Sequence, residues 1–179
     1  PPPPPPTTVE GYLGVLEDTL LVRRLPAYEA RLRVRERKHP KLYWVDPGVA
    51  RAAKGAHGAV AQEEVGPLLE GWVHTLLCTL IAERELAEEV AYWAPAESSK
   101  LEVDFVLRRG SELCAIEVKS GRRTDPGQLA GLRAIGDLPG MRRRILVHRG
   151  ARATTTEDGI ETWPIETFVE ALAEDRLWP

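Results

Sequence analysis

The feature that most constrains the fold is a pair of short apolar runs joined by a turn, LEVDFVLRRG and ELCAIEVKSG, within residues 101–121. Runs of this length, rich in apolar residues and separated by a glycine-containing turn, are typical of two antiparallel strands in a hairpin. Their composition predicts burial, yet they carry Asp104, Glu117 and Lys119. The sequence therefore predicts a buried hairpin with charged side chains near its centre.

The surrounding patterns place this hairpin in an α/β fold, with a mixed sheet of four or more strands flanked by helices. Helical apolar spacing covers about 58–87, and a second helix is expected from Asp125-Pro126 to about Leu138. The triplet Ile-Leu-Val at 145–147 predicts a strand that is buried on both faces. The remaining expected elements are strands at EVAYWAPA and GIETWPI and a closing helix at ETFVEALAEDRL.

The first 56 residues are expected to form a smaller unit. Residues 1–6 are all proline and predict a polyproline stub, followed by a helix that begins at Thr7 or Thr8. A strand is expected at LLVRRLPAY and a short helix at 48–55. Between them, Arg31, Arg33, Arg35 and Arg37 alternate with other residues, which predicts a strand with an arginine face.

A helix followed by a two-stranded hairpin is similar to the end of a winged helix, although an edge strand protected by its charges would have the same pattern. The predicted organisation is a stub at 1–6, a winged-helix-like segment at 7–56 and a second domain at 57–179.

Charge is distributed unevenly along the chain. The net charge of −3 predicts no polyanionic partner by itself, but residues 1–60 and 100–150 are rich in lysine and arginine. The two cysteines, Cys78 and Cys114, have no metal-binding spacing and are expected to be buried thiols. Because no run approaches the ~18 apolar residues of a membrane span, we expect a cytoplasmic protein with no membrane partner.

The three charged residues of the hairpin should meet at one place. Glu117 and Lys119 are two positions apart and project from the same face of their strand, and Asp104 lies on the neighbouring strand. Two carboxylates at that distance repel each other unless one is protonated or a cation lies between them. Oxygen ligands without histidine or cysteine favour Mg²⁺ or Mn²⁺. The alternative is an internal ion pair, which would cost several kcal/mol per ion in desolvation.

The spacing of Asp104, twelve intervening residues and then Glu117-Val118-Lys119 resembles the PD-(D/E)XK signature of restriction-endonuclease-like nucleases. The blocks GPLLEGWVHTLL, LEVDFVL and AIEVKSG closely resemble a domain of unknown function at the C-terminal end of many prokaryotic AAA-type ATPases. TTVEGYLGVLEDTLLVRRLPAY and KLYWVDPGVARA resemble the stretch that precedes this domain.

The resemblance implies a restriction-endonuclease-like fold and metal-dependent hydrolysis of DNA. Asp104 and Glu117 would hold Mg²⁺ or Mn²⁺, with the Val118 carbonyl as a further ligand and Lys119 positioning the attacking water. The superfamily places another acidic residue on the preceding helix, which matches Glu70, and a polar residue that matches Gln128. Five arginines are candidates for contacts with DNA phosphates: Arg122, Arg123, Arg142, Arg143 and Arg144.

Partners other than DNA follow from the same resemblance. The sequence has no GxxxxGK[ST] motif, so it does not supply the phosphate-binding loop of an ATPase itself. An ATPase module, or another protein, is therefore an expected partner. The alternative function is a non-catalytic module with a nuclease-like fold that binds proteins or nucleic acids.

Overall fold

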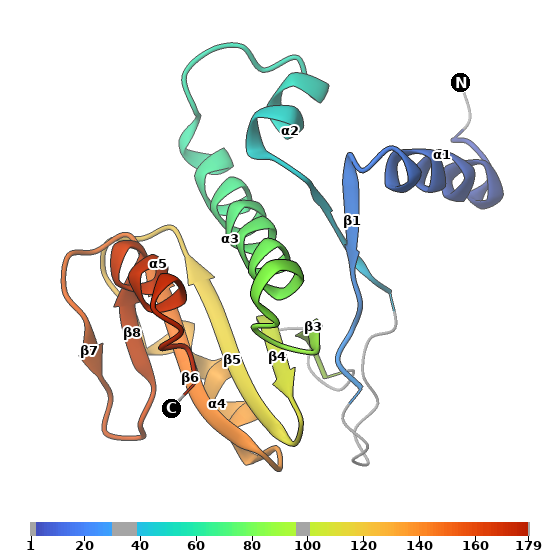
Figure 1. The fold of residues 1–179 in the computed structure, drawn as a ribbon. Coiled ribbons are helices and arrows are strands. Elements are labelled where there is room, and N and C mark those ends of the chain that lie inside the picture. Colours follow the sequence, from blue (N-terminus) through green and yellow to red (C-terminus); the bar gives the residue numbers. More distant parts are fainter. Residues whose placement is uncertain (1–2, 30–38, 96–100, 179) are drawn as a thin grey trace.

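The computed structural model describes residues 3–29, 39–95 and 101–178. Its centre is a mixed sheet of six strands in the order β3-β4-β5-β6-β8-β7, which confirms the predicted α/β class (Figure 1). The first three strands are antiparallel, whereas β5, β6 and β8 run parallel. The strands are β3 (Glu89–Trp93), β4 (Val103–Arg109), β5 (Glu112–Lys119), β6 (Met141–His148), β7 (Thr154–Thr155) and β8 (Glu161–Pro164).

The sheet is covered on both faces, which explains why its central strands are mostly apolar. Helices α3 (Gln62–Arg84) and α5 (Ile165–Ala173) cover one face, where Leu77 and Phe168 pack against Phe105 and Ile116. The other face packs against a short helical segment made of η1 (Pro126–Leu129), α4 (Ala130–Ala134) and η2 (Ile135–Asp137). A strand between two such layers has no solvated face and needs no alternation of polar residues.

The N-terminal residues form a separate two-stranded antiparallel sheet. Its strands are β1 (Val22–Leu25) and β2 (Lys41–Trp44), preceded by α1 (Pro6–Asp18) and followed by α2 (Pro47–Ala53). The arginine-faced strand predicted around Arg31 to Arg37 lies outside the described residues. The N-terminal sheet is joined to the main one beside β3, where Tyr92 N–H donates to the Pro26 carbonyl at 2.9 Å.

Helix α1 begins earlier than the sequence predicts. Pro6 is its first residue and Pro5 precedes it, whereas neither Thr7 nor Thr8 caps it. Proline suits the first turn because its φ is already helical and its missing N–H is not needed there. The predicted polyproline stub is therefore shorter than six residues.

Helix α3 is continuous and contains Pro67 within its second turn. Proline near the start of a helix removes only one early hydrogen bond, which the following turns compensate. Among the described residues, α3 alone is long and apolar enough to cross a membrane by length and composition. In this fold it packs against the sheet, with Val73 and Leu77 fully buried.

The helix expected from Asp125 to Leu138 is instead broken into η1, α4 and η2. Gly131 in this segment approaches the chain before β4 so closely that a Cβ atom there would lie 2.1 Å from the Glu102 carbonyl oxygen. Glycine is therefore required where α4 crosses the start of β4, and the segment has the low helix propensity that glycine brings.

Gly131→Ala is expected to lower the free energy of unfolding by at least about 2 kcal/mol, because the added methyl group meets backbone atoms that cannot turn away. Gly127→Ala is the matched control: no atom lies within 4 Å of its Cβ position. Urea unfolding followed by circular dichroism measures both. Equal stability of the two variants would contradict the close packing of α4 on β4.

Candidate active site at the end of the hairpin

The hairpin register brings the predicted charged residues together. Phe105 pairs with Ile116, so Asp104 and Glu117 lie opposite each other on the same face. Val118 N–H donates to Asp104 Oδ2 at 2.9 Å, and Asp104 N–H donates to Glu117 Oε2 at 3.3 Å. The Lys119 ammonium forms an ion pair with Glu117 Oε1. Both carboxylates are buried although they carry charge.

These groups open into one cavity of about 380 Å³ between α3, the hairpin and the η1–α4 segment. Glu70 from α3 and Gln128 from η1 also line it, as the resemblance implied. The Gln128 amide oxygen accepts a hydrogen bond from Asp125 N–H at 3.0 Å. The remaining lining residues are Glu102, Gly127, Ala130 and Gly131.

Lys41 is the main site residue that sequence reasoning missed. Its Nζ atom lies 2.5 Å from Glu102 Oε1, 3.1 Å from Glu70 Oε1 and 3.3 Å from Asp104 Oδ1. Lys41 is the first residue of β2, from the N-terminal sheet. An ammonium group from the N-terminal sheet therefore joins three carboxylates of residues 65–168.

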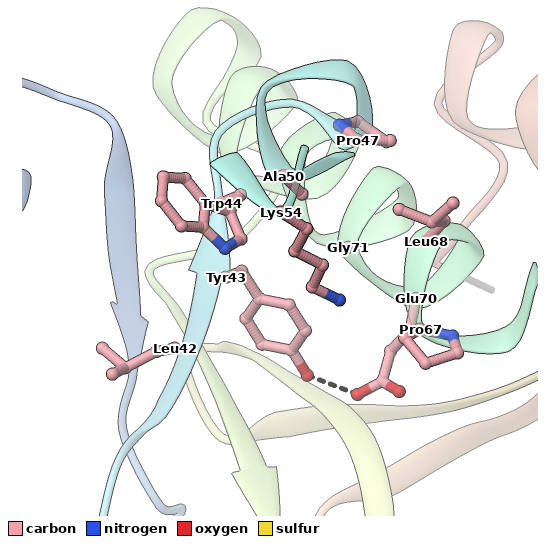
Figure 2. A pocket seen from close by; sticks show the side chains of 10 residues that line it. All are labelled: Leu42, Tyr43, Trp44, Pro47, Ala50, Lys54, Pro67, Leu68, Glu70 and Gly71. Atoms are coloured by element: carbon pink, nitrogen blue, oxygen red, sulfur yellow. Dashed lines mark hydrogen bonds between the residues drawn. The ribbon is translucent and has the colours of Figure 1, made fainter. Parts of the chain in front are cut away.

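Tyr43 is a second missed residue, and it comes from the same strand. Figure 2 shows its ring reaching from β2 toward α3, where the hydroxyl donates to Glu70 Oε1. The contact lies beside a smaller, mostly apolar cavity of about 170 Å³. Lys41 and Tyr43 are two residues apart on one strand, so they share a face of it. This spacing was the signal in the sequence that could have identified them as a pair.

Burial dominates the electrostatics of the two carboxylates. It raises the pKa of Asp104 to about 6, and the charge of Glu70 adds to the effect. It likewise raises the pKa of Glu117 to about 7, with a further contribution from Asp104. Burial opposes the charged form of Lys41, but the nearby Asp104 and Glu70 outweigh it and raise the pKa of the ammonium.

The pocket has more negative than positive charge. The described residues contribute four carboxylates and two ammonium groups to the pocket and no other charged side chain. The net charge of the pocket is therefore −2 when all six groups are ionised. Even so, no three acidic, histidine or cysteine side chains of the described chain are arranged to hold a metal ion together. Lys41 and Lys119 contact carboxylate oxygens of Asp104 and Glu117.

A second cavity of about 700 Å³ lies beyond the carboxyl ends of β5 and β6. At these ends Lys119 of β5 is the register partner of His148 of β6. Its lining includes Arg122 and Arg123, and also Arg152, which the sequence analysis did not single out. The three guanidinium groups are exposed and form no ion pair or hydrogen bond with another described residue. They are therefore free to bind an anion.

The structure places Arg142, Arg143 and Arg144 elsewhere. They lie at the start of β6, beside the start of β5, whereas the carboxylate pocket lies at the far end of β5. Arg142 pairs with Glu112 at 3.0 Å, and Arg143 pairs with Glu161 at 2.8 Å. Arg144 donates to the backbone carbonyls of Leu132 and Asp158. All three guanidinium groups thus have partners within the chain.

Comparison with known proteins places the chain in a family. Residues 5–59 match a domain of unknown function (DUF8612). The chain is 27% identical over 175 residues to "Uncharacterized protein Rv2008c" of Mycobacterium tuberculosis and, equally, to "Uncharacterized protein Mb2031c" of Mycobacterium bovis. Each match covers 96% of this chain but 38% of the relative, so the chain spans well under half the length of these proteins. No solved structure matches it. Residues 65–168, more than half of the chain, match a domain of unknown function (DUF4143), and the chain belongs to this family.

Proposed function

We propose that this protein hydrolyses DNA phosphodiester bonds with a PD-(D/E)XK-like site that uses Mg²⁺ or Mn²⁺. The observation that carries the proposal is the convergence of Asp104, Glu117 and Lys119 in one cavity, with Glu70 on its wall. A buried cluster of carboxylates is costly unless something compensates it. Such a cluster with an ammonium group beside it is a candidate functional site on physical grounds.

The donor chemistry of the pocket fits a hard divalent cation. Its ligands would be the carboxylate oxygens of Asp104, Glu117 and Glu70, which is the type of ligand that Mg²⁺ and Mn²⁺ prefer. The net charge of −2 equals the charge that one such ion would neutralise. When bound, the ion would lower the pKa of a water ligand and stabilise charge on the phosphate.

The other roles belong to side chains of the chain itself. Lys119 has an ammonium group at the pocket, where it can orient the attacking water or stabilise the negative charge that develops on the phosphate. Glu117 holds Lys119 in place through their ion pair. Gln128, across the pocket, offers amide hydrogens to a phosphate oxygen because its own oxygen already accepts from Asp125.

The arginine-lined cavity supports a nucleic-acid substrate. It begins next to Lys119, so a strand with one phosphate at the carboxylate pocket could place neighbouring phosphates against Arg122, Arg123 and Arg152. Guanidinium groups without internal partners need not give up a bond in order to bind a phosphate. We therefore assign the phosphate contacts to these three arginines.

The triple variant Arg122→Gln/Arg123→Gln/Arg152→Gln is expected to weaken DNA binding at least about tenfold and to reduce the salt slope by about two to three, because three phosphate contacts are lost. Arg142→Gln is the matched control, since it removes one exposed guanidinium that already pairs with Glu112. Fluorescence anisotropy over a salt series, with EDTA present, measures binding without cleavage. A larger effect of Arg142→Gln would indicate that DNA binds at the other end of β5.

The activity itself is tested with plasmid, linear duplex and single-stranded DNA, each incubated with Mg²⁺, with Mn²⁺ or with EDTA. Cleavage that requires the metal supports the proposal and identifies the preferred substrate. No cleavage of any substrate, together with no binding of Mn²⁺, contradicts it.

A non-catalytic binding module is the second candidate, and one observation favours it. Helix α1 buries none of its residues and exposes Tyr12 and Val15, as a helix with a protein partner would. The relatives are longer than this chain, so the partner could be an ATPase module of the same or another polypeptide. In that case, neither metal nor DNA would bind, and deletion of α1 would remove the partner interaction.

A further inference from the structure

Every carboxylate oxygen at the centre of the pocket already has a partner. Asp104 Oδ1 contacts Lys41 at 3.3 Å, and Asp104 Oδ2 accepts from Val118 N–H at 2.9 Å. Glu117 Oε1 contacts Lys119, and Glu117 Oε2 accepts from Asp104 N–H. A cation that binds both residues must therefore displace at least one of these contacts.

Lys41 is the partner that a divalent ion would most readily replace. It contributes a positive charge to three carboxylates, which is the role that the ion would take over. A lysine side chain has four rotatable bonds and can leave without movement of its strand, whereas the Val118 N–H belongs to the hairpin backbone. Lys119 is a poorer choice because it lies two residues from Glu117 on the same strand, which keeps its ammonium within reach of that carboxylate.

The backbone of Lys41 is held beside the pocket by the N-terminal sheet. Lys41 pairs with Leu25 across β1 and β2, and the Tyr92 hydroxyl donates to the His39 carbonyl at 2.6 Å. The ammonium also lies 5.5 Å from the centre of the Tyr92 ring, a cation–π contact. The position of β2 thus sets how close the ammonium comes to the carboxylates.

We infer that Lys41 is a built-in competitor of the divalent cation, by which the N-terminal segment controls metal entry into the carboxylate pocket. The inference rests on the proposed function, because it requires that Asp104 and Glu117 bind a metal ion. Two separately matched parts of the chain then form one site: residues 65–168 supply all four carboxylates, and residues 5–59 supply the Lys41 ammonium that contacts three of them. Movement of β2 away from α3 would open the site.

The test is a titration of the full chain with Mn²⁺ at pH 8, followed by the electron paramagnetic resonance signal of the free ion. Lys41→Met is expected to bind Mn²⁺ at least about tenfold more tightly than wild type, because a like charge next to the ion is removed. Lys41→Arg, which keeps the charge, should bind as wild type does. Lys54→Met is the matched control for loss of one lysine from the N-terminal segment, and it should bind within about twofold of wild type.

Thermal unfolding provides a second measurement that does not depend on activity. Without metal, Lys41→Met should melt at a lower temperature than wild type because its carboxylates lose a counter-charge, and Mn²⁺ should raise its melting temperature more than that of wild type. If wild type binds Mn²⁺ and Lys41→Met binds equally or more weakly, the competition is refuted and the metal site stands. If neither protein binds Mn²⁺, both the metal site and the competition are refuted.

Discussion

Asp104→Asn is expected to lower the rate of DNA cleavage at least about 1,000-fold while DNA binding stays within about twofold of wild type. Asp104 lies at the centre of the pocket, where its carboxylate faces Lys41 and lines the same cavity as Glu117. An amide is a weaker ligand for a cation than a carboxylate, but its oxygen still accepts the hydrogen bond from Val118 N–H. The change therefore removes a proposed metal ligand and preserves the hairpin.

Glu112→Gln is the control for this experiment. Like Asp104, Glu112 lies on the hairpin and pairs with a basic side chain, here Arg142, but it lies at the opposite end of β5 from the pocket. Cleavage of a labelled duplex in Mn²⁺ should continue at the wild-type rate in this variant. If Asp104→Asn cleaves as fast as Glu112→Gln, the carboxylate pocket is not the active site.

The stability of the metal-free protein is expected to depend on pH through Asp104 and Glu117. Their folded-state pKa values, about 6 and about 7, lie above the ordinary values of 3.8 and 4.5. The folded protein therefore binds more protons than the unfolded chain between these limits. The stabilisation that results is complete below the ordinary values and is lost as the pH rises through about 6 to 7.

The double variant Asp104→Asn/Glu117→Gln is thus expected to be more stable than wild type at pH 8 by several kcal/mol, with a smaller advantage at pH 5. Both amides are uncharged like the protonated acids, so they avoid the repulsion among Glu70, Asp104 and Glu117. Lys41 and Lys119 face the same pocket and remain charged throughout this range, so they add no pH dependence.

Urea unfolding between pH 5 and pH 8, with EDTA present, measures this difference. Burial lowers the pKa values of His74 and His148, so these histidines make the fold more stable as the pH rises. Their effect opposes that of Asp104 and Glu117. Both proteins contain the histidines, so the difference between variant and wild type isolates the two carboxylates. A double variant that is several kcal/mol less stable than wild type at pH 8 would show instead that the carboxylates form stabilising ion pairs with the lysines.

The hairpin and the charged residues that it brings together could be predicted from the sequence. Twelve residues separate Asp104 from Glu117, and a turn at Gly110 sets their register, so both side chains reach the same face. Because side chains on a strand alternate with a period of two, this part of the site depends only on local geometry. The strand at 145–147 was equally clear, since burial on both faces leaves a continuous apolar run.

Helix propensity predicted the secondary structure less well where another segment of the chain packs closely against the backbone. Asp125-Pro126 is a strong start signal for a helix, but the segment that follows is divided into η1, α4 and η2. The reason lies at Gly131, which touches the Glu102 carbonyl region of a distant segment. A contact with a distant segment cannot be recognised from the spacing of apolar residues within the helical segment.

Which basic residues belong to the pocket depends on contacts between segments that are distant in the chain. Lys41 is 63 positions away from Asp104 in the chain, and it reaches the pocket because β2 lies against α3. The run at 142–144 is the densest cluster of arginine, yet the parallel pairing of β5 with β6 places it at the opposite end of β5 from the carboxylate pocket, whereas Arg152 lines the cavity beside His148. Local spacing determines which face of a strand a residue occupies, whereas the packing of distant apolar surfaces determines which residues that face will meet.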